Sequence, residues 1–168
     1  MEITNKVANS GLTTIDLEEF YDNSTRMVFD IKPLLFQELI LKEKDFRAFI
    51  LAHQWSTYRD ALVSIVCTAD AIVPNWAYML IASNLQPFAK KVFFGSQAEL
   101  EKELFSDAIK KIEPKEYENA RVVIKGCSKI NVPISAYVEI TSLLKPYVKS
   151  IMYGEPCSTV PIYKKAKE

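Results

Sequence analysis

Two stretches of this chain resemble each other so closely that any fold must accommodate the same pattern twice. Residues 63–95 align without gaps on residues 122–154, and 12 of the 33 aligned positions are identical. Chance would give roughly two identities at ordinary amino-acid composition. The identities include Val-Pro and Ala-Tyr pairs at matched places and a closing glycine, Gly95 or Gly154. We therefore expect an internal duplication.

Each copy predicts a strand, a helix and a second strand. A short apolar run bounded by a polar loop is typical of a buried strand, and a proline suits the first turn of a helix because its missing N–H is not needed there. A second proline ends each helix. The expected elements are strands at 63–67 and 91–94 around a helix from Pro74 to Leu85, and strands at 122–125 and 150–153 around a helix from Pro133 to Leu144.

An amphipathic helix is expected between the copies, over residues 96–113. Ser96 and Glu99 have the spacing of a capping box, in which each residue bonds the backbone N–H of the other. The apolar residues of this segment recur at helical spacing, so they predict its buried side. They are Leu100, Leu104, Ile109 and Ile112.

Alternation of strands and helices favours an α/β fold. We expect internally duplicated strand–helix–strand units in a mostly parallel or mixed sheet flanked by helices. The chain should form a single domain over 1–168. Its expected segments are an irregular N-terminal region over 1–60 (with a short strand at Met27–Phe29 and a helix over Glu43–His53), repeat one 63–95, the linking helix 96–113, repeat two 122–154 and a C-terminal segment 155–168.

Composition argues against several classes of function. The 21 Lys and Arg residues balance 21 Asp and Glu, whereas nucleic-acid binders usually carry a strongly basic surface. No apolar run approaches the ~18 residues of a membrane span, and the first residues lack the apolar stretch of a signal peptide. With four glycines, the chain has neither a P-loop nor a dinucleotide fingerprint. We expect a cytoplasmic protein without nucleic-acid or membrane partners, and a homodimer stays open.

The three cysteines all follow strands of the predicted sheet. Cys67 ends the first strand of copy one, Cys127 follows the matching strand of copy two, and Cys157 comes shortly after the last core strand. If the strands are parallel, their carboxyl ends place the three thiols on one edge, where open α/β sheets have their sites. Three thiolates suit zinc or an iron–sulfur cluster. The pattern therefore predicts a metal site formed by Cys67, Cys127 and Cys157.

Asp70 is the candidate for a fourth ligand or for a residue that orients a ligand. It lies three residues after Cys67 on the same predicted edge, although an aspartate here is also typical of a loop turn. Glu155 is a further candidate, and a cluster with three protein ligands stays open. His53 is the only histidine. It ends a helix that leads into the amino end of the strand at 63–67, so we expect it at the opposite edge, as a core histidine.

A second interpretation needs no metal. Unpaired cysteine often behaves as a small buried hydrophobe, and Cys67 continues an apolar run. Tyr78 and Tyr137 occupy matched positions in the two repeat helices, where aromatic residues usually belong to the core. If they instead line a crevice, the protein is an interaction module or a small-ligand-binding module with Tyr78 and Tyr137 at its site. Sulfur transfer through one reactive thiol is a third alternative.

Several strings in the sequence resemble an uncharacterised bacterial family, domain of unknown function 2480. They are ITNKVANSGL, LILKEKDFR, CTADAIVPNWAYML, RVVIKGC and SIMYGEPCSTVP. The resemblance covers essentially the whole chain, and these strings include Cys67, Asp70, Cys127 and Cys157. It implies no reaction, so catalytic residues stay unknown.

Genes of this family often stand beside those of the sulfur-mobilisation iron–sulfur assembly system. The resemblance therefore implies an accessory role in iron–sulfur assembly and assembly proteins as partners. Metal and acid-labile sulfide, measured on anaerobically prepared protein, test the predicted centre: protein without either would contradict it.

Overall fold

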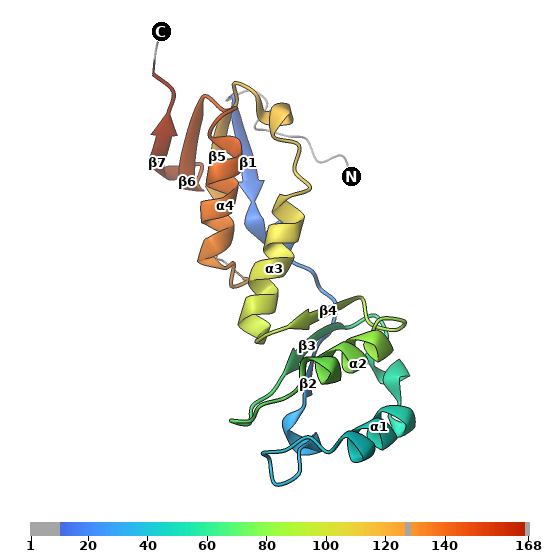
Figure 1. Cartoon of the computed structure of the whole chain (residues 1–168). Coiled ribbons are helices and arrows are strands. Elements are labelled where there is room, and N and C mark those ends of the chain that lie inside the picture. Colours follow the sequence, from blue (N-terminus) through green and yellow to red (C-terminus); the bar gives the residue numbers. More distant parts are fainter. Residues whose placement is uncertain (1–10, 127–128, 167–168) are drawn as a thin grey trace. The chain divides into compact units, whose positions relative to one another are not determined.

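The chain divides into two compact units, which we describe separately (Figure 1). The computed structural model describes residues 11–126 and 129–166. Residues 23–100 form one unit, which we call the inserted unit. Residues 1–22 and 101–168 belong to the other, which we call the composite unit because its two segments flank the inserted unit in sequence. Two compact units thus stand where a single domain was expected over 1–168.

The inserted unit contains a three-stranded parallel sheet in the order β2–β3–β4. Its main elements are β2 (Arg26–Asp30), α1 (Glu43–Ala52), β3 (Leu62–Val66), α2 (Asn75–Leu85) and β4 (Lys91–Phe94). The central strand β3 is buried at four of its five residues, since it has a strand on each side and helices over the sheet. This burial explains why β3 is the near-continuous apolar run of the sequence.

The composite unit contains a four-stranded mixed sheet in the order β1–β5–β6–β7. Its elements are β1 (Leu12–Asp16), α3 (Gln97–Ile109), β5 (Arg121–Lys125), α4 (Ile134–Leu144), β6 (Ser150–Glu155) and β7 (Ser158–Lys164), with α3 crossing the boundary between the units. The first three strands are parallel, and β7 returns antiparallel to β6. Helices α3 and α4 are joined by a hydrogen bond of 2.9 Å from the Ser106 hydroxyl to the Glu139 carboxylate.

The two strand–helix–strand segments match element by element. Helix α2 begins at Asn75 and α4 at Ile134, an offset of 59 residues that also relates β3 to β5 and the starts of β4 and β6. In each unit an N-terminal strand, β2 or β1, pairs in parallel with the first strand of the segment. The elements predicted for both segments are therefore confirmed. A common origin by duplication stays a prediction.

The predicted α/β class, with mostly parallel strands flanked by helices, is confirmed. The strands form two sheets, because each strand–helix–strand segment pairs with its own strand from the N-terminal region of the chain. Of those N-terminal strands, β2 was predicted in part, whereas β1 lies in the stretch expected to be irregular. Strand β7 was also missed. It lies at an edge, and most of its residues are exposed, so it lacks the apolar run of a buried strand.

The linking helix is shorter than predicted and ends at Ile109. Its capping box is confirmed: the Glu99 N–H donates to the Ser96 hydroxyl at 3.2 Å, and the Ser96 N–H donates to the Glu99 carboxylate at 2.8 Å. Phe105 is buried in the composite unit's core, whereas Leu104 is only partly buried.

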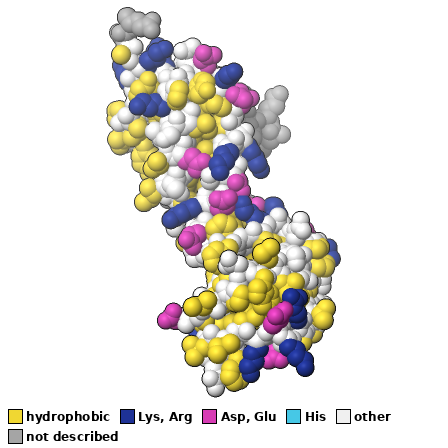
Figure 2. All heavy atoms as spheres, viewed as in Figure 1, with side chains coloured by type: hydrophobic (Ala, Val, Ile, Leu, Met, Phe, Trp, Pro, Cys, Tyr) yellow, Lys and Arg dark blue, Asp and Glu magenta, His cyan; other side chains and the backbone are white. Residues whose placement is uncertain are grey.

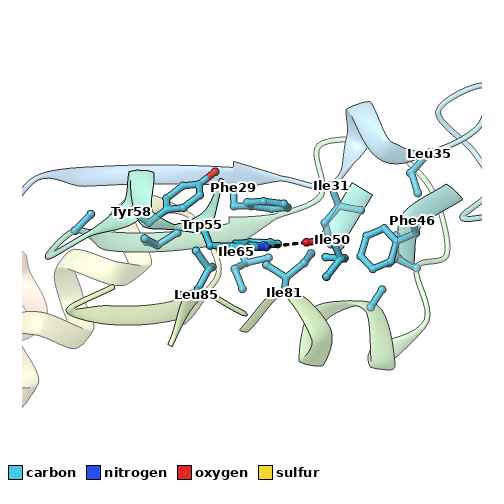
Figure 3. Close-up of a cluster of buried hydrophobic side chains, with 14 residues drawn as sticks. Phe29, Ile31, Leu35, Phe46, Ile50, Trp55, Tyr58, Ile65, Ile81 and Leu85 are labelled. Carbon is cyan, nitrogen blue, oxygen red and sulfur yellow. Dashed lines mark hydrogen bonds between the residues drawn. The ribbon is translucent and has the colours of Figure 1, made fainter. Parts of the chain in front are cut away.

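The core of the inserted unit contains several aromatic rings, among them those of Phe29, Trp55 and Tyr58 (Figure 3). We call Phe29, Phe49, His53, Trp55 and Tyr58 the aromatic cluster. Phe29 and Trp55 stack with their ring centroids 5.6 Å apart, and the Trp55 indole N–H donates to the Ile50 carbonyl at 2.9 Å. Strand β2, the end of α1 and the segment before β3 thereby pack together. In the described residues, none of the helices is long and apolar enough to cross a membrane.

Candidate functional site

The cysteines that the structure describes lie in different units. Cys67 is partly buried and directly follows β3 in the inserted unit. Cys157 is exposed in the short turn between β6 and β7 of the composite unit. Cys127 lies outside the described residues. The expectation that all three thiols follow strands of one sheet is therefore wrong, because β3 and β6 belong to two sheets.

The other two predicted ligands, Asp70 and Glu155, do not belong to any metal-binding group of side chains among the described residues. Asp70 is exposed, and the Cys67 thiol lies 3.6 Å from the Ala69 carbonyl. Glu155 lies 3.7 Å from the Lys125 ammonium, so it has a cationic neighbour. Within residues 11–126 and 129–166, no three His, Cys, Asp or Glu side chains gather closely enough to hold a metal ion. A zinc or iron–sulfur centre formed by Cys67, Cys127 and Cys157 stays a prediction.

His53 packs among aromatic rings at the end of α1. Its ring centroid lies 4.7 Å from that of Trp55 and 4.8 Å from that of Phe49. The Nε2 atom is buried and has no hydrogen-bond partner among the described residues. These contacts agree with the interpretation of His53 as part of the packing.

The carboxyl end of β2 carries a polar residue, Asp30, that was not among the predicted site residues. Asp30 accepts hydrogen bonds from the Lys32 N–H at 3.0 Å, and from both the N–H and the hydroxyl of Thr68. Burial alone would raise the pKa of Asp30, but the Thr68 and Lys32 hydrogen bonds and the Lys32 charge together lower it below its ordinary value. Asp30 thus ties β2 to the loop that carries Cys67.

We expect Asp30→Asn to lower the free energy of unfolding near neutral pH by about 0.5–1.5 kcal/mol, the usual net value of an intramolecular hydrogen bond. A lowered pKa stabilises the fold above the unfolded-state pKa of about 3.9, and this contribution is lost as pH falls through the folded-state pKa. The difference from wild type should therefore shrink toward pH ~2. Urea titrations at both pH values measure it, with exposed Asp70→Asn as control. An equal deficit at both pH values would contradict the assignment.

The matching edge of the composite unit is held by an ion network. The Lys125 ammonium lies 3.3 Å from the Asp16 carboxylate, which itself accepts a hydrogen bond from the Glu18 N–H at 3.0 Å. The hydrogen bond and charge of Asp16, together with the charge of Glu155, raise the pKa of Lys125 above its ordinary value. This edge links β1, β5 and β6 through charges, since the Lys125 ammonium lies 3.3 Å from the Asp16 carboxylate and 3.7 Å from the Glu155 carboxylate.

Tyr78 lies beside Cys67 in the inserted unit. Its ring packs edge-on against Phe94, with the centroids 5.1 Å apart. Burial raises the pKa of Tyr78, and the nearby Cys67 adds to the increase. Tyr78 therefore lies near Cys67 within this unit. Tyr137, which was expected to share a crevice with Tyr78 in the second interpretation, lies in the other unit.

Tyr137 is the matching residue of the composite unit. Its ring packs edge-on against Tyr153, with the centroids 5.8 Å apart. A Cβ atom added at Gly126 would lie only 2.7 Å from the Tyr137 hydroxyl oxygen. Gly126 stands where the inserted unit has Cys67, so the missing side chain makes room for the tyrosine hydroxyl at the end of β5. Space, rather than a positive φ, favours glycine here, because an added Cβ atom would displace the tyrosine hydroxyl.

A crevice opens between α4 and the β6–β7 hairpin, and we call it the α4 crevice. Its volume is about 490 Å³. It is lined by Ile124, Asn131, Val132, Ile134, Tyr137, Thr141, Ile151, Met152, Tyr153 and Ile162. Most of these side chains are apolar, while Asn131, Thr141 and the two tyrosines contribute polar atoms. The second interpretation of the sequence had Tyr137 at a crevice together with Tyr78, whereas Tyr78 lies in the other unit. Strand β7, which supplies Ile162, was not predicted.

Comparison with known proteins identifies the family without adding a function. No curated protein and no solved structure matches the chain. A family model described as "Protein of unknown function (DUF2480)" matches residues 1–165, which is essentially the whole chain. The chain therefore belongs to the DUF2480 family.

Proposed function

We propose that the composite unit binds a small, mainly apolar ligand in the α4 crevice. A volume of about 490 Å³ is within the range of roughly 300–1,000 Å³ typical of small-molecule sites. The lining combines apolar side chains with a few hydrogen-bonding groups, as such sites usually do. This crevice is the observation that carries the proposal.

Apolar side chains are exposed at the rim of the crevice, and this supports the binding of a ligand that would shield them from water. Ile134 is 81% exposed and Ile162 is 52% exposed, although both are large aliphatic residues. Figure 2 shows hydrophobic side chains reaching the visible surface of the unit that contains α4. Covering apolar surface contributes roughly 25 cal/mol per Å², so a ligand of matching shape gains affinity at this rim.

The rings of Tyr137 and Tyr153 form one wall of the crevice. Tyr137 is fixed on α4 and Tyr153 on β6, and their edge-on contact leaves ring surface along the crevice. The Thr141 hydroxyl donates its proton to the Tyr137 backbone carbonyl at 2.6 Å, so this hydroxyl does not donate to a ligand. We therefore expect a flat or aromatic ligand with a polar group directed to Asn131 or to a tyrosine hydroxyl.

The uncharged fluorescent probe N-phenyl-1-naphthylamine tests the proposal. We expect saturable binding to the wild-type protein, with a dissociation constant raised about tenfold by Ile162→Glu, a change equivalent to about 1.4 kcal/mol. A carboxylate at this position places charge beside the apolar lining, which is costly without a partner.

Val160→Glu is the matched control, because Val160 lies on the same strand and is 56% exposed but does not line the crevice. It should bind the probe as wild type does. Absence of saturable probe binding to the wild-type protein, or an equal loss of probe affinity in the two variants, would contradict the proposal. A cytoplasmic location and an accessory role in iron–sulfur assembly stay predictions that this experiment does not address.

A further inference from the structure

Among the residues that the structure describes, no strand covers the outer edge of β4, whereas β7 covers the matching edge in the other unit. In the composite unit, β7 pairs antiparallel with β6 and closes that side of the sheet. In the inserted unit, β4 matches β6 but is the last strand of its sheet among the residues that the structure describes. Unpaired strand edges readily pair with another strand, so this edge is a candidate site for strand pairing.

The backbone groups available on this edge belong to Val92 and Phe94. The Lys91 N–H donates to the Ala61 carbonyl and the Gly95 N–H donates to the Ile65 carbonyl, so residues 91, 93 and 95 turn their backbone groups toward β3. Because alternate residues of a strand face opposite sides, Val92 and Phe94 turn their N–H and C=O groups outward. The Phe94 side chain is 67% exposed.

A groove of about 460 Å³ runs beside this edge. It is lined by Ala82, Ser83, Gln86, Ala89, Lys90, Lys91 and Val92. In the composite unit, the matching place beside Ile151 is taken by Tyr163 of β7, whose ring lies 5.4 Å from the Lys145 ammonium. Gln86 and Val92 are the counterparts of Lys145 and Ile151 at the 59-residue offset. The groove is therefore shaped for an aromatic side chain from an antiparallel strand.

We propose that the occupant is β4 of a second copy of this chain, paired antiparallel about a twofold axis at Phe93. Val92 of each copy then lies opposite Phe94 of the other, and these residues exchange their outward N–H and C=O groups in two hydrogen-bonded pairs. Each Phe94 thereby takes the place beside Val92 that Tyr163 takes beside Ile151. The two three-stranded sheets become one continuous sheet of six strands.

Charge and symmetry agree with this register. A twofold axis perpendicular to the sheet places α2 of both copies on the same face of the six-stranded sheet. Residues that lie opposite each other must then point their side chains to the same face of the sheet, as Val92 and Phe94 do. Lys91 of one copy lies opposite Gly95 of the other, so like charges do not face each other directly across the pair. Because β4 has only four residues, we expect a weak, concentration-dependent dimer.

Sedimentation equilibrium over a range of protein concentrations tests the proposal. The wild-type chain should show a reversible monomer–dimer equilibrium, and Phe94→Lys should raise the dimer dissociation constant at least ~10-fold. Val28→Lys is the matched control: Val28 is 48% exposed on β2, the opposite edge of the same sheet, and this variant should dimerise as wild type does. A wild-type chain that stays monomeric, or a dimer unaffected by Phe94→Lys, would overturn the proposal.

Cross-linking identifies the register independently of affinity. In the antiparallel pair, the two copies of Phe93 oppose each other without hydrogen bonds, at a Cα separation of about 4.5 Å that a disulfide can span. In a chain with Cys67, Cys127 and Cys157 replaced by serine, Phe93→Cys should give a covalent dimer on mild oxidation. Val28→Cys in the same background should not. Equal cross-linking of the two variants, or none for Phe93→Cys, contradicts the pairing.

Discussion

Trp55→Ala is expected to lower the free energy of unfolding of the inserted unit by about 3–5 kcal/mol, as large-to-small aromatic substitutions in cores usually do. Trp55 is 8% exposed and contacts three other rings of the aromatic cluster, namely Phe29, His53 and Tyr58. The substitution leaves a cavity beside these rings and removes the hydrogen bond to the Ile50 carbonyl (Figure 3).

Tryptophan fluorescence measures this effect in the relevant unit, because Trp55 and Trp76 are the chain's two tryptophans and both lie in the inserted unit. In Trp55→Ala the remaining Trp76 reports the urea transition of that unit. Leu51→Ala is the control on α1: Leu51 is 88% exposed, and we expect a change within about 0.5 kcal/mol. A loss below about 1 kcal/mol for Trp55→Ala would show that the cluster does not stabilise the unit as described.

Gly126→Ala should destabilise the composite unit by about 1–3 kcal/mol, the usual cost of overpacking, and displace Tyr137 from its place beside β5. The added methyl group would lie 2.7 Å from the Tyr137 hydroxyl oxygen and 3.4 Å from the nearest atoms of Leu17 and Val132. Since Tyr137 lines the α4 crevice, we also expect weaker binding of N-phenyl-1-naphthylamine.

A double-mutant cycle isolates this contact. Tyr137→Phe removes the hydroxyl group, so Gly126→Ala should cost less in that background, with a coupling of about 0.5–3 kcal/mol. Urea unfolding followed by circular dichroism measures the four proteins. Cys67→Ala at the matching position of the inserted unit is the control, because a side chain is already accommodated there. Equal costs of Gly126→Ala with and without the hydroxyl would contradict the steric account.

Local patterns predicted most of the fold because the relevant signals lie within short segments. The prolines at 74 and 133 precede helices that begin at the next residue, and the apolar runs became the central strands β3 and β5. The capping box of Ser96 and Glu99 formed as expected, since it needs only one turn of helix. Each of these features depends on neighbours fewer than about five residues away.

The edge strands were harder to predict for a physical reason. Strand β1 has one fully buried residue, Ile15, and β7 has none, so neither shows the apolar run that marks a central strand. Their formation depends on backbone hydrogen bonds to strands elsewhere, as when β1 pairs with β5 more than a hundred residues away. Such pairing is not encoded in local periodicity.

The candidate site was predicted only in its helical portion. Tyr137 was identified because it recurs in the repeat, but Gly126 and Ile162 act through contacts that the alignment does not reveal. The three cysteines were placed on one edge by assuming one sheet, and the division into two sheets removes that assumption.

The sequence by itself determined that this chain contains two strand–helix–strand segments, since apolar runs and helix-ending prolines act locally. Only the tertiary structure decided that each segment takes its own N-terminal strand and that β7 covers β6 while β4 keeps an open edge among the described residues. The reason is that strand partners are selected by hydrogen bonds and packing between distant segments. The α4 crevice and the proposed dimer edge both follow from that choice, because β7 is present in one unit and the structure describes no counterpart of it beside β4 in the other.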